Sequence, residues 1–196
     1  TERGFNDGYH LKEGFYMIDF SNFSTEELLK SGGFDCECGV HHEAPIKFLK
    51  IGSGAVRSIP DALKALGCKK PFIVCDLNTK DAAWHFVEPV LRENGIDYGF
   101  FCFNTHKRLE PNEEVIGAIT FAFDKTCDVV MALGSGVLND NCKIIADIAG
   151  IPAMVVGTAP SMDGYASNSS CMIVGGLKVS LYHGMPDAII ADTDIM

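Results

Sequence analysis

The hydrophobic positions of this chain follow two alternating patterns from residue 45 onward. Short apolar runs, such as Val129-Val130-Met131-Ala132-Leu133, alternate with longer segments whose apolar residues recur every three or four positions. The short runs predict strands that are buried on both faces, and the longer segments predict amphipathic helices. Their alternation predicts βαβ units arranged in a parallel sheet.

The predicted strands are 46–51, 71–75, 97–103, 127–133, 153–156 and 188–191, and the predicted helices are 55–66, 80–93, 112–124 and 139–149. Two further strands flank Gly175-Gly176, a pair typical of a hairpin turn. The predicted fold is therefore an α/β, Rossmann-like, mostly parallel sheet with helices on both faces and a C-terminal β-hairpin.

Residues 1–44 follow neither pattern, so we expect an irregular N-terminal extension ahead of a dinucleotide-binding α/β domain at 45–196. One helix is predicted in the extension, because Ser24 is a good N-cap and Glu27 stands at the capping-box position.

The extension also carries a Cys/His head, which consists of Cys36, Cys38, His41 and His42. Two thiols and two imidazoles can hold zinc. The Cys-x-Cys spacing is tighter than usual for such sites, so a thiol-bearing loop without metal is the favoured prediction and zinc the open alternative.

Composition narrows the function. The 196 residues include 47% hydrophobic and 21% charged residues, and the net charge is −10. An acidic surface repels phosphate backbones, so we expect no nucleic-acid partner. No apolar run is long enough for a membrane span and no signal-peptide layout is visible, so we expect no membrane association. Eight cysteines without a secretory signal favour a reducing cytoplasm.

A glycine turn, Gly134-Ser135-Gly136, joins a predicted buried strand to a predicted helix. Backbone N–H groups and a helix N-terminus meet there, which suits a phosphate group. A tight turn without a ligand is an equally good interpretation. Asp140 and Lys143 follow on one helix face, as a pair of site residues or as a surface salt bridge.

Two other polar features follow strands. Asp76 ends one strand, where an acid can accept from ribose hydroxyls and disfavours a 2′-phosphate, although it can equally be a helix cap. The loop after 153–156 offers Thr158, Ser161 and Asp163. Asp163 can bind a divalent metal or simply make a turn.

Together these motifs resemble the glycerol-1-phosphate dehydrogenases, which belong to the superfamily of iron-containing alcohol dehydrogenases, glycerol dehydrogenases and 3-dehydroquinate synthases. The segment Ser-Met-Asp-Gly-Tyr-Ala-Ser at 161–167 is the most specific part of the resemblance. The resemblance implies a metal-dependent oxidoreductase that reduces dihydroxyacetone phosphate to glycerol 1-phosphate with NAD(H) or NADP(H). Asp76 favours NAD. The implied metal is a single zinc or nickel ion.

The resemblance also assigns roles. The implied cofactor-binding residues are Asp76, Gly134, Ser135, Gly136, Thr158, Ser161 and Ser167; Asp163 is the implied metal ligand, Asp140 and Lys143 line the substrate region, and Lys178 is a weaker phosphate contact. The family completes its metal site with two histidines from a helical C-terminal domain, which this sequence does not include. We therefore expect a truncated chain with little activity alone, self-associating or homo-oligomeric through its exposed interdomain face.

Two alternatives remain. A 3-dehydroquinate synthase-like lyase would show a different stretch after Asp163, where this chain has Gly-Tyr-Ala-Ser. A non-catalytic nucleotide-binding module with a zinc-bearing head would bind metal through Cys36 and Cys38.

Overall fold

The computed structural model describes residues 9–12, 15–18, 23–36 and 38–196. The chain divides into two compact units, Thr1–Pro45 and Ile46–Met196, one residue from the boundary expected from the sequence. Each unit is described by itself.

The first unit contains two short antiparallel hairpins and a helix. Strand β1 (Tyr9–Lys12) pairs with β2 (Phe15–Ile18), and β3 (Phe34–Asp35) pairs with β4 (His41–His42). Helix α1 (Thr25–Lys30) has the predicted capping box, in which Ser24 and Glu27 satisfy each other's backbone N–H groups. Part of the predicted irregular extension is thus ordered as hairpins, whereas 1–8, 13–14, 19–22 and 37 lie outside the described residues.

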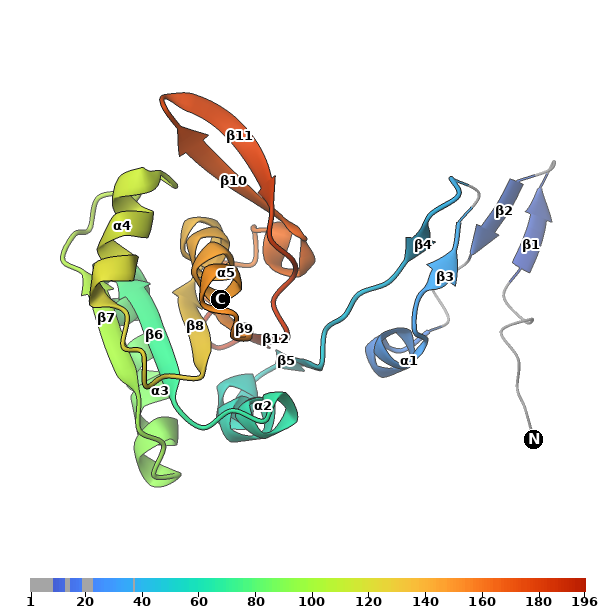
Figure 1. The fold of residues 1–196 in the computed structure, drawn as a ribbon. Coiled ribbons are helices and arrows are strands. Elements are labelled where there is room, and N and C mark those ends of the chain that lie inside the picture. Colours follow the sequence, from blue (N-terminus) through green and yellow to red (C-terminus); the bar gives the residue numbers. More distant parts are fainter. Residues whose placement is uncertain (1–8, 13–14, 19–22, 37) are drawn as a thin grey trace. The chain divides into compact units, whose positions relative to one another are not determined.

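The second unit is built on six strands, which are β5 (Phe48–Gly52), β6 (Pro71–Asp76), β7 (Gly99–Phe103), β8 (Val129–Gly134), β9 (Ala153–Gly157) and β12 (Ala188–Asp192). Their order in the sheet is β5-β12-β9-β8-β6-β7, and all neighbouring strands run parallel (Figure 1). The predicted α/β fold with a parallel sheet is confirmed.

The helices of the second unit are α2 (Ile59–Leu66), α3 (Leu77–Glu93), α4 (Glu113–Ala122) and α5 (Gly136–Ala149). The predicted helix 55–66 begins instead as a 3-10 turn, η3 (Ala55–Ser58). Helix α5 begins three residues before its predicted start, because Ser135 already has the extended backbone of an N-cap. Helix α3 also begins early, since Asp76 caps it.

Alternate strand residues explain why helices cover both faces. Ile73 and Met131 belong to one buried cluster with α2 and α3, whereas Val74 and Ala132 are equally buried but point to the opposite face. Helices α4 and α5 contact each other, and α5 packs on β8 and β9. The strands β6 and β8 are buried along their whole length, as two covered faces require.

The predicted C-terminal hairpin is also present, as β10 (Ser169–Val174) paired with β11 (Leu177–Tyr182). Gly175 and Gly176 have φ values of 57° and 81°, the left-handed pair that a tight hairpin turn requires. A short 3-10 turn, η4 (Gly164–Ala166), precedes the hairpin. Among the described helices, none is long and apolar enough to cross a membrane.

Candidate functional site

The strand order of the sheet has its topological switch point between β6 and β8. The strand that follows β6 in the chain adds on one side of the sheet, and the strand that follows β8 adds on the other. Open parallel sheets bind ligands at such a reversal, beyond the carboxyl ends of the strands. A cavity of about 510 Å³ lies there, and its lining includes the predicted cofactor residues Asp76, Ser135, Gly136 and Ser161.

One wall of this switch-point cavity is the N-terminus of α5. Ser135 is the N-cap residue, but its side chain makes no capping hydrogen bond, and the first turn contains no acidic residue. The first N–H groups of a helix have no partner within the helix and carry a partial positive charge. The turn therefore presents unneutralised donors to the cavity.

Gly134 stands where a side chain would not fit. A Cβ atom on this residue would collide with the buried side chain of Leu138, and its Cβ–Cβ distance would be 3.0 Å. The carbonyl of Gly134 accepts a hydrogen bond from the Thr158 N–H at 3.2 Å. Thr158 is thus joined to the glycine turn through its backbone.

Asp76 lies at the carboxyl end of β6, the strand next to β8, and is 9% exposed. Its Oδ1 accepts from the Thr79 N–H at 2.8 Å, so Asp76 is the N-cap of α3, as the sequence allowed. No donor among the described residues contacts Oδ2. One carboxylate oxygen on the cavity wall thus remains available to a ligand.

Tyr165 anchors the loop that follows β9. Its phenol donates to the Ala159 carbonyl at 3.1 Å, and its Oη would lie 3.0 Å from a Cβ on Gly157. Burial raises the pKa of Tyr165, so the group remains a neutral donor. This contact fixes the segment that carries Ser161 to the cavity.

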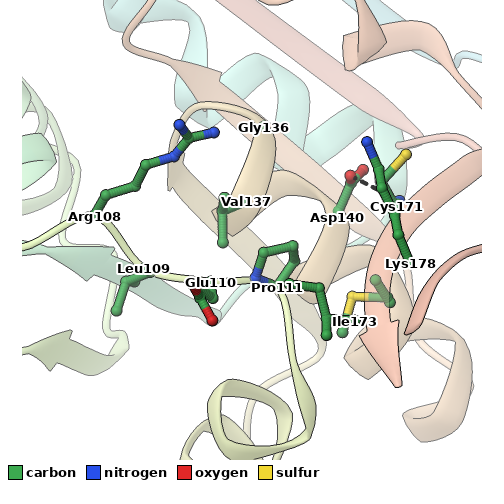
Figure 2. A pocket seen from close by; sticks show the side chains of 11 residues that line it. Arg108, Leu109, Glu110, Pro111, Gly136, Val137, Asp140, Cys171, Ile173 and Lys178 are labelled. Atoms are coloured by element: carbon green, nitrogen blue, oxygen red, sulfur yellow. Dashed lines mark hydrogen bonds between the residues drawn. The ribbon is translucent and has the colours of Figure 1, made fainter. Parts of the chain in front are cut away.

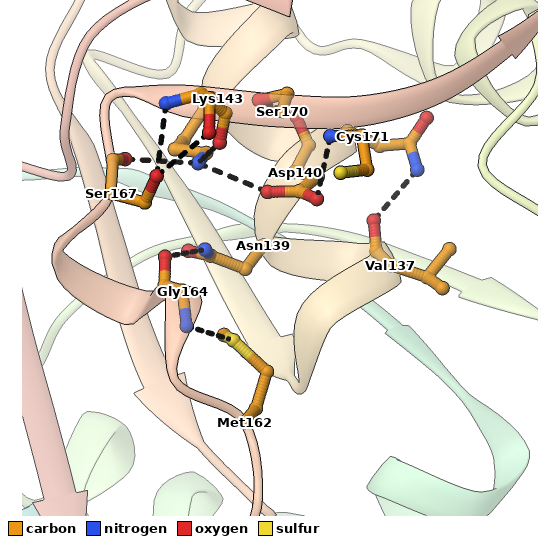
Figure 3. A network of polar contacts seen from close by, with 11 residues as sticks. Val137, Asn139, Asp140, Lys143, Met162, Gly164, Ser167, Ser170 and Cys171 are labelled. Atoms are coloured by element: carbon orange, nitrogen blue, oxygen red, sulfur yellow. Dashed lines mark hydrogen bonds and ion pairs between the residues drawn. The ribbon is translucent and has the colours of Figure 1, made fainter. Parts of the chain in front are cut away.

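Lys143 has a supporting position. It is 2% exposed, and its ammonium contacts the Ser167 carbonyl at 3.1 Å, the Ser169 carbonyl at 2.7 Å and Asp140 Oδ1 at 3.0 Å (Figure 3). An ammonium has three donors, and all three are used within the chain. Lys143 is buried and Asp140 is partly buried, so the pair is not a surface salt bridge. Lys143 holds Asp140 and the backbone before β10, and the Ser167 hydroxyl pairs with Ser169 at 2.9 Å.

A second cavity, of about 480 Å³, shares Arg108, Leu109, Gly136 and Val137 with the first. Its lining also includes Asp140 and Lys178 (Figure 2). Asp140 Oδ2 accepts from the Cys171 N–H at 3.1 Å, which fixes the carboxylate at the cavity wall. The lining therefore includes two cationic residues, Arg108 and Lys178, and two acidic residues, Glu110 and Asp140, beside the α5 N-terminus.

The sequence analysis missed Arg108, which lines both cavities. Arg108 could have been predicted as a site residue, because it follows β7 and therefore lies beyond the carboxyl end of a parallel strand. His106, in the same loop, exchanges contacts with Asn78 at 3.0 and 3.1 Å and also lines the switch-point cavity.

Asp192 was missed as well. It is 1% exposed and accepts from the Gly54 and Val56 N–H groups at 3.2 and 2.8 Å. Gly54 belongs to the first Gly-Ser-Gly turn, 52–54, and Val56 lies in the η3 turn that follows it. The signal was an acid at the carboxyl end of a strand, the same pattern that singled out Asp76.

Asp163 is exposed and precedes η4. It belongs to no group of three potential metal ligands within the described part of the chain. A single carboxylate does not complete a first shell for zinc. The described residues around Asp163 therefore do not by themselves form a metal site.

The parallel sheet with a cavity at its switch point defines the class of Rossmann-like α/β domains. Comparison with known proteins narrows this class. The sequence model of a family described as iron-containing alcohol dehydrogenase matches residues 50–196. The chain belongs to the iron-containing alcohol dehydrogenase family.

Curated relatives carry the name glycerol-1-phosphate dehydrogenase [NAD(P)+]. The chain is 30% identical over 165 residues to the protein from Halalkalibacterium halodurans, which covers 83% of this chain and 41% of the relative. It is 30% identical over 149 residues to the protein from Methanosarcina mazei, which covers 74% of this chain and 40% of the relative. The chain spans about two fifths of the length of these relatives.

Solved structures share the fold. A glycerol dehydrogenase from Schizosaccharomyces pombe aligns with a TM-score of 0.64 at 19% identity, over 77% of this chain and 38% of that protein. An iron-containing alcohol dehydrogenase from Thermotoga maritima aligns with a TM-score of 0.67 at 16% identity, over 79% of this chain and 48% of that protein. At these identities the similarity supports the fold alone.

Proposed function

We propose that this chain is the nucleotide-binding part of an NAD(P)-dependent dehydrogenase that interconverts dihydroxyacetone phosphate and glycerol 1-phosphate. The observation that carries the proposal is the uncapped N-terminus of α5 facing a switch-point cavity with Asp76 on its other side. The names of the curated relatives supply the reaction. They also favour the dehydrogenase over the lyase alternative.

The cofactor would lie with its pyrophosphate at the α5 N-terminus, where Gly134, Ser135 and Gly136 allow close approach of the backbone. Asp76 Oδ2 would accept from an adenosine ribose hydroxyl. A 2′-phosphate beside this carboxylate would be repelled, which favours NAD over NADP. When bound, the nicotinamide supplies or accepts the hydride.

The loop after β9 would face the nicotinamide end through Thr158 and Ser161, with Ser167 nearby. Ser161 lines the cavity, whereas the backbone of Thr158 is bonded to the glycine turn. These residues would orient the ring and limit the access of water.

The polyol phosphate would occupy the second cavity. Arg108 and Lys178 are its cationic lining residues and would bind the phosphate. Asp140 would accept a hydroxyl proton from the substrate, and Lys143 would act through Asp140 as a positioning residue. Asp163 would contribute one ligand to a divalent metal.

Calorimetric titration of the 196-residue chain with NADH tests the cofactor site. We expect saturable binding of one NADH per chain, which ADP-ribose displaces because it carries the pyrophosphate and adenosine. The absence of saturable binding of both NADH and NADPH at millimolar concentration would contradict the proposal.

The substrate class requires a second titration. Glycerol 1-phosphate should bind the NAD-loaded chain more tightly than glycerol does, and either Arg108→Ala or Lys178→Ala should reduce that difference. Loss of one charge-assisted contact corresponds to about 1.5–3 kcal/mol, or at least roughly tenfold in Kd. Equal affinities for glycerol and its phosphate would point to an unphosphorylated polyol instead.

A further inference from the structure

The first unit brings three potential metal ligands together. Cys36 Sγ, Cys38 Sγ and a ring nitrogen of His42 all lie within 4.8 Å of one another. Cys38 Sγ is 3.2 Å from His42 Nε2. Within the described residues, this is the group of three or more histidine, cysteine or carboxylate side chains that is compact enough to hold an ion.

The hairpin between β3 and β4 produces this arrangement. The Cys36 N–H donates to the Val40 carbonyl at 3.1 Å, and the Gly39 N–H donates to the Cys36 carbonyl at 2.9 Å. Gly39 has a φ of 80°, which lets the chain turn back between the second thiol and β4. Because Phe34 pairs with His42, the imidazole returns beside the thiols from the opposite strand.

The hairpin geometry explains how a metal site can form despite the short Cys-x-Cys spacing, which the sequence analysis took as unfavourable for zinc. A site built from four ligands within seven consecutive residues would be strained. Here the two thiols come from one end of the hairpin and the imidazole from the strand that returns. Three ligands therefore converge without a fourth from the same short segment.

His41 is not part of the cluster. Its Nδ1 is 2.8 Å from Asp35 Oδ1, and its Nε2 is 2.8 Å from the Gly32 carbonyl oxygen. Successive residues of a strand point to opposite faces, so His41 and His42 separate into two roles. Both ring nitrogens of His41 are used to close the hairpin, which leaves His42 as the imidazole ligand.

We propose that Cys36, Cys38 and His42 bind a zinc ion that stabilises the β3–β4 hairpin. Two thiolates and one imidazole are a donor set that zinc prefers, and harder cations such as magnesium do not. Tetrahedral zinc with ordinary bond lengths separates two sulfur ligands by about 3.8 Å and a sulfur from a nitrogen ligand by about 3.5 Å. The cluster needs only small side-chain adjustments to reach these distances.

The fourth position is open to solvent, since Cys38 and His42 are exposed. The site stands apart from the proposed function in chemistry as well as in sequence. It uses thiolates in Thr1–Pro45, whereas the proposed dehydrogenase metal would use the carboxylate of Asp163 in Ile46–Met196. One site can therefore fail without the other.

Metal content of the full 196-residue chain tests the inference. The protein is purified with a thiol reductant in the Asp163→Ala background, and zinc is measured by mass spectrometry after dialysis against metal-free buffer. We expect one zinc per chain. We further expect Co²⁺ to replace it with a thiolate-to-cobalt absorption band, which a carboxylate site does not produce.

Single substitutions assign the ligands. Cys36→Ser, Cys38→Ser and His42→Gln should each weaken zinc binding by at least about tenfold, since even changes outside the first shell cost 10–100-fold. The two serine variants should also lower the cobalt band. The matched controls are Cys68→Ser and His85→Gln, which lie in Ile46–Met196 and should leave zinc content and the cobalt band unchanged.

Three results would overturn the proposal. One is the absence of zinc at micromolar free metal with both thiols reduced. Another is zinc that remains at wild-type affinity in the three ligand variants. The third is a Cys36–Cys38 disulfide that persists under reductant, because the sulfur atoms would then not be thiolate ligands. If a variant fails to fold, the cobalt spectrum of the remaining single variants still decides the assignment.

Discussion

The second unit contains the same Gly-Ser-Gly turn after two of its parallel strands, and the two turns differ in what neutralises their N–H groups. At 52–54, after β5, Asp192 accepts from Gly54 and Val56, and Asp194 accepts from the Ser53 hydroxyl at 2.7 Å. At 134–136, after β8, no side chain among the residues that the structure describes caps the helix.

The glycines also serve different purposes. Gly54 has a φ of 70° and open space around its Cβ position, so it is needed for backbone conformation. Gly134 has no positive φ but faces Leu138, so it is needed for space. The same three residues, Gly-Ser-Gly, thus form one turn whose N–H groups donate to the protein's own carboxylates and one turn at a helix start without a side-chain cap among the described residues.

The largest expected effect comes from giving the second turn its own carboxylate. Ser135→Asp should lower NADH affinity roughly 100-fold, because a charge about 5 Å from the pyrophosphate costs on the order of 3 kcal/mol at an effective dielectric constant of 20. The same change should raise the free energy of unfolding by up to about 1 kcal/mol, since Asp is a good N-cap. Calorimetry and urea unfolding measure both.

Ser135→Asn is the matched control, because Asn caps a helix as well as Asp but carries no charge. It should show the gain in stability with a much smaller loss of NADH affinity. Unchanged NADH binding by the aspartate variant would place the cofactor away from the α5 N-terminus.

The next largest effect is expected from removing the Asp192 carboxylate that accepts from the turn at 52–54. Asp192→Ala removes the carboxylate acceptor of the Val56 and Asp194 N–H groups and one of the two carboxylates that accept from the Gly54 N–H. It should lower the free energy of unfolding by about 2–3 kcal/mol. NADH affinity should change less than about twofold at a temperature where the variant is folded. Asp194→Ala removes an exposed partner of the same turn and should cost less than about 1 kcal/mol.

Substitutions of Gly54 and Gly134 test whether each glycine is needed for its backbone conformation or for the lack of a side chain. Gly54→Ala should cost about 1–2 kcal/mol of stability, and Gly54→Asn less, since Asn tolerates the left-handed region. Gly134→Ala and Gly134→Asn should both cost about 1–3 kcal/mol, because either side chain meets Leu138. If Gly134→Asn were clearly more stable than Gly134→Ala, the conclusion that Gly134 is needed to leave room for Leu138 would be contradicted.

The smallest effect concerns the acid that faces the second turn across the cavity. Asp76→Asn keeps a cap for α3 but removes the charge that would repel a 2′-phosphate. The ratio of NADPH to NADH affinity should rise about tenfold, equivalent to about 1.4 kcal/mol, with little change in stability. An unchanged ratio would mean that Asp76 does not meet the ribose.

Much of the second unit could be predicted from the sequence. Apolar runs such as Val129–Leu133 identified the strands because a strand covered on both faces must be apolar throughout. Helix starts were predicted less well. The predicted starts of α3 and α5 were late, because the capping residues Asp76 and Ser135 stand next to the strand ends and break the apolar pattern.

The candidate site divides in the same way. The sequence singled out Asp76, the 134–136 turn and Ser161, since each follows a strand and carboxyl ends of parallel strands share one edge. It did not find Arg108 or Asp192, and it left the Cys/His head as an unfavoured metal site. Asp192 accepts from donors beyond another strand, the imidazole of His42 reaches the thiols across a hairpin, and Arg108 lines cavities together with residues far from it in the sequence.

The sequence by itself determined that this is a parallel α/β domain with glycine turns at strand ends, because apolar periodicity and turn chemistry are local properties. Only the tertiary structure decided which turn remains open. Asp192 reaches Gly54 across 138 positions of sequence because β12 pairs with β5, whereas within the described part of the chain no strand end brings a carboxylate to Ser135. Strand order, which depends on how all the segments pack together, assigns a carboxylate to the turn at 52–54 and leaves the helix start at 134–136 without a capping side chain among the described residues.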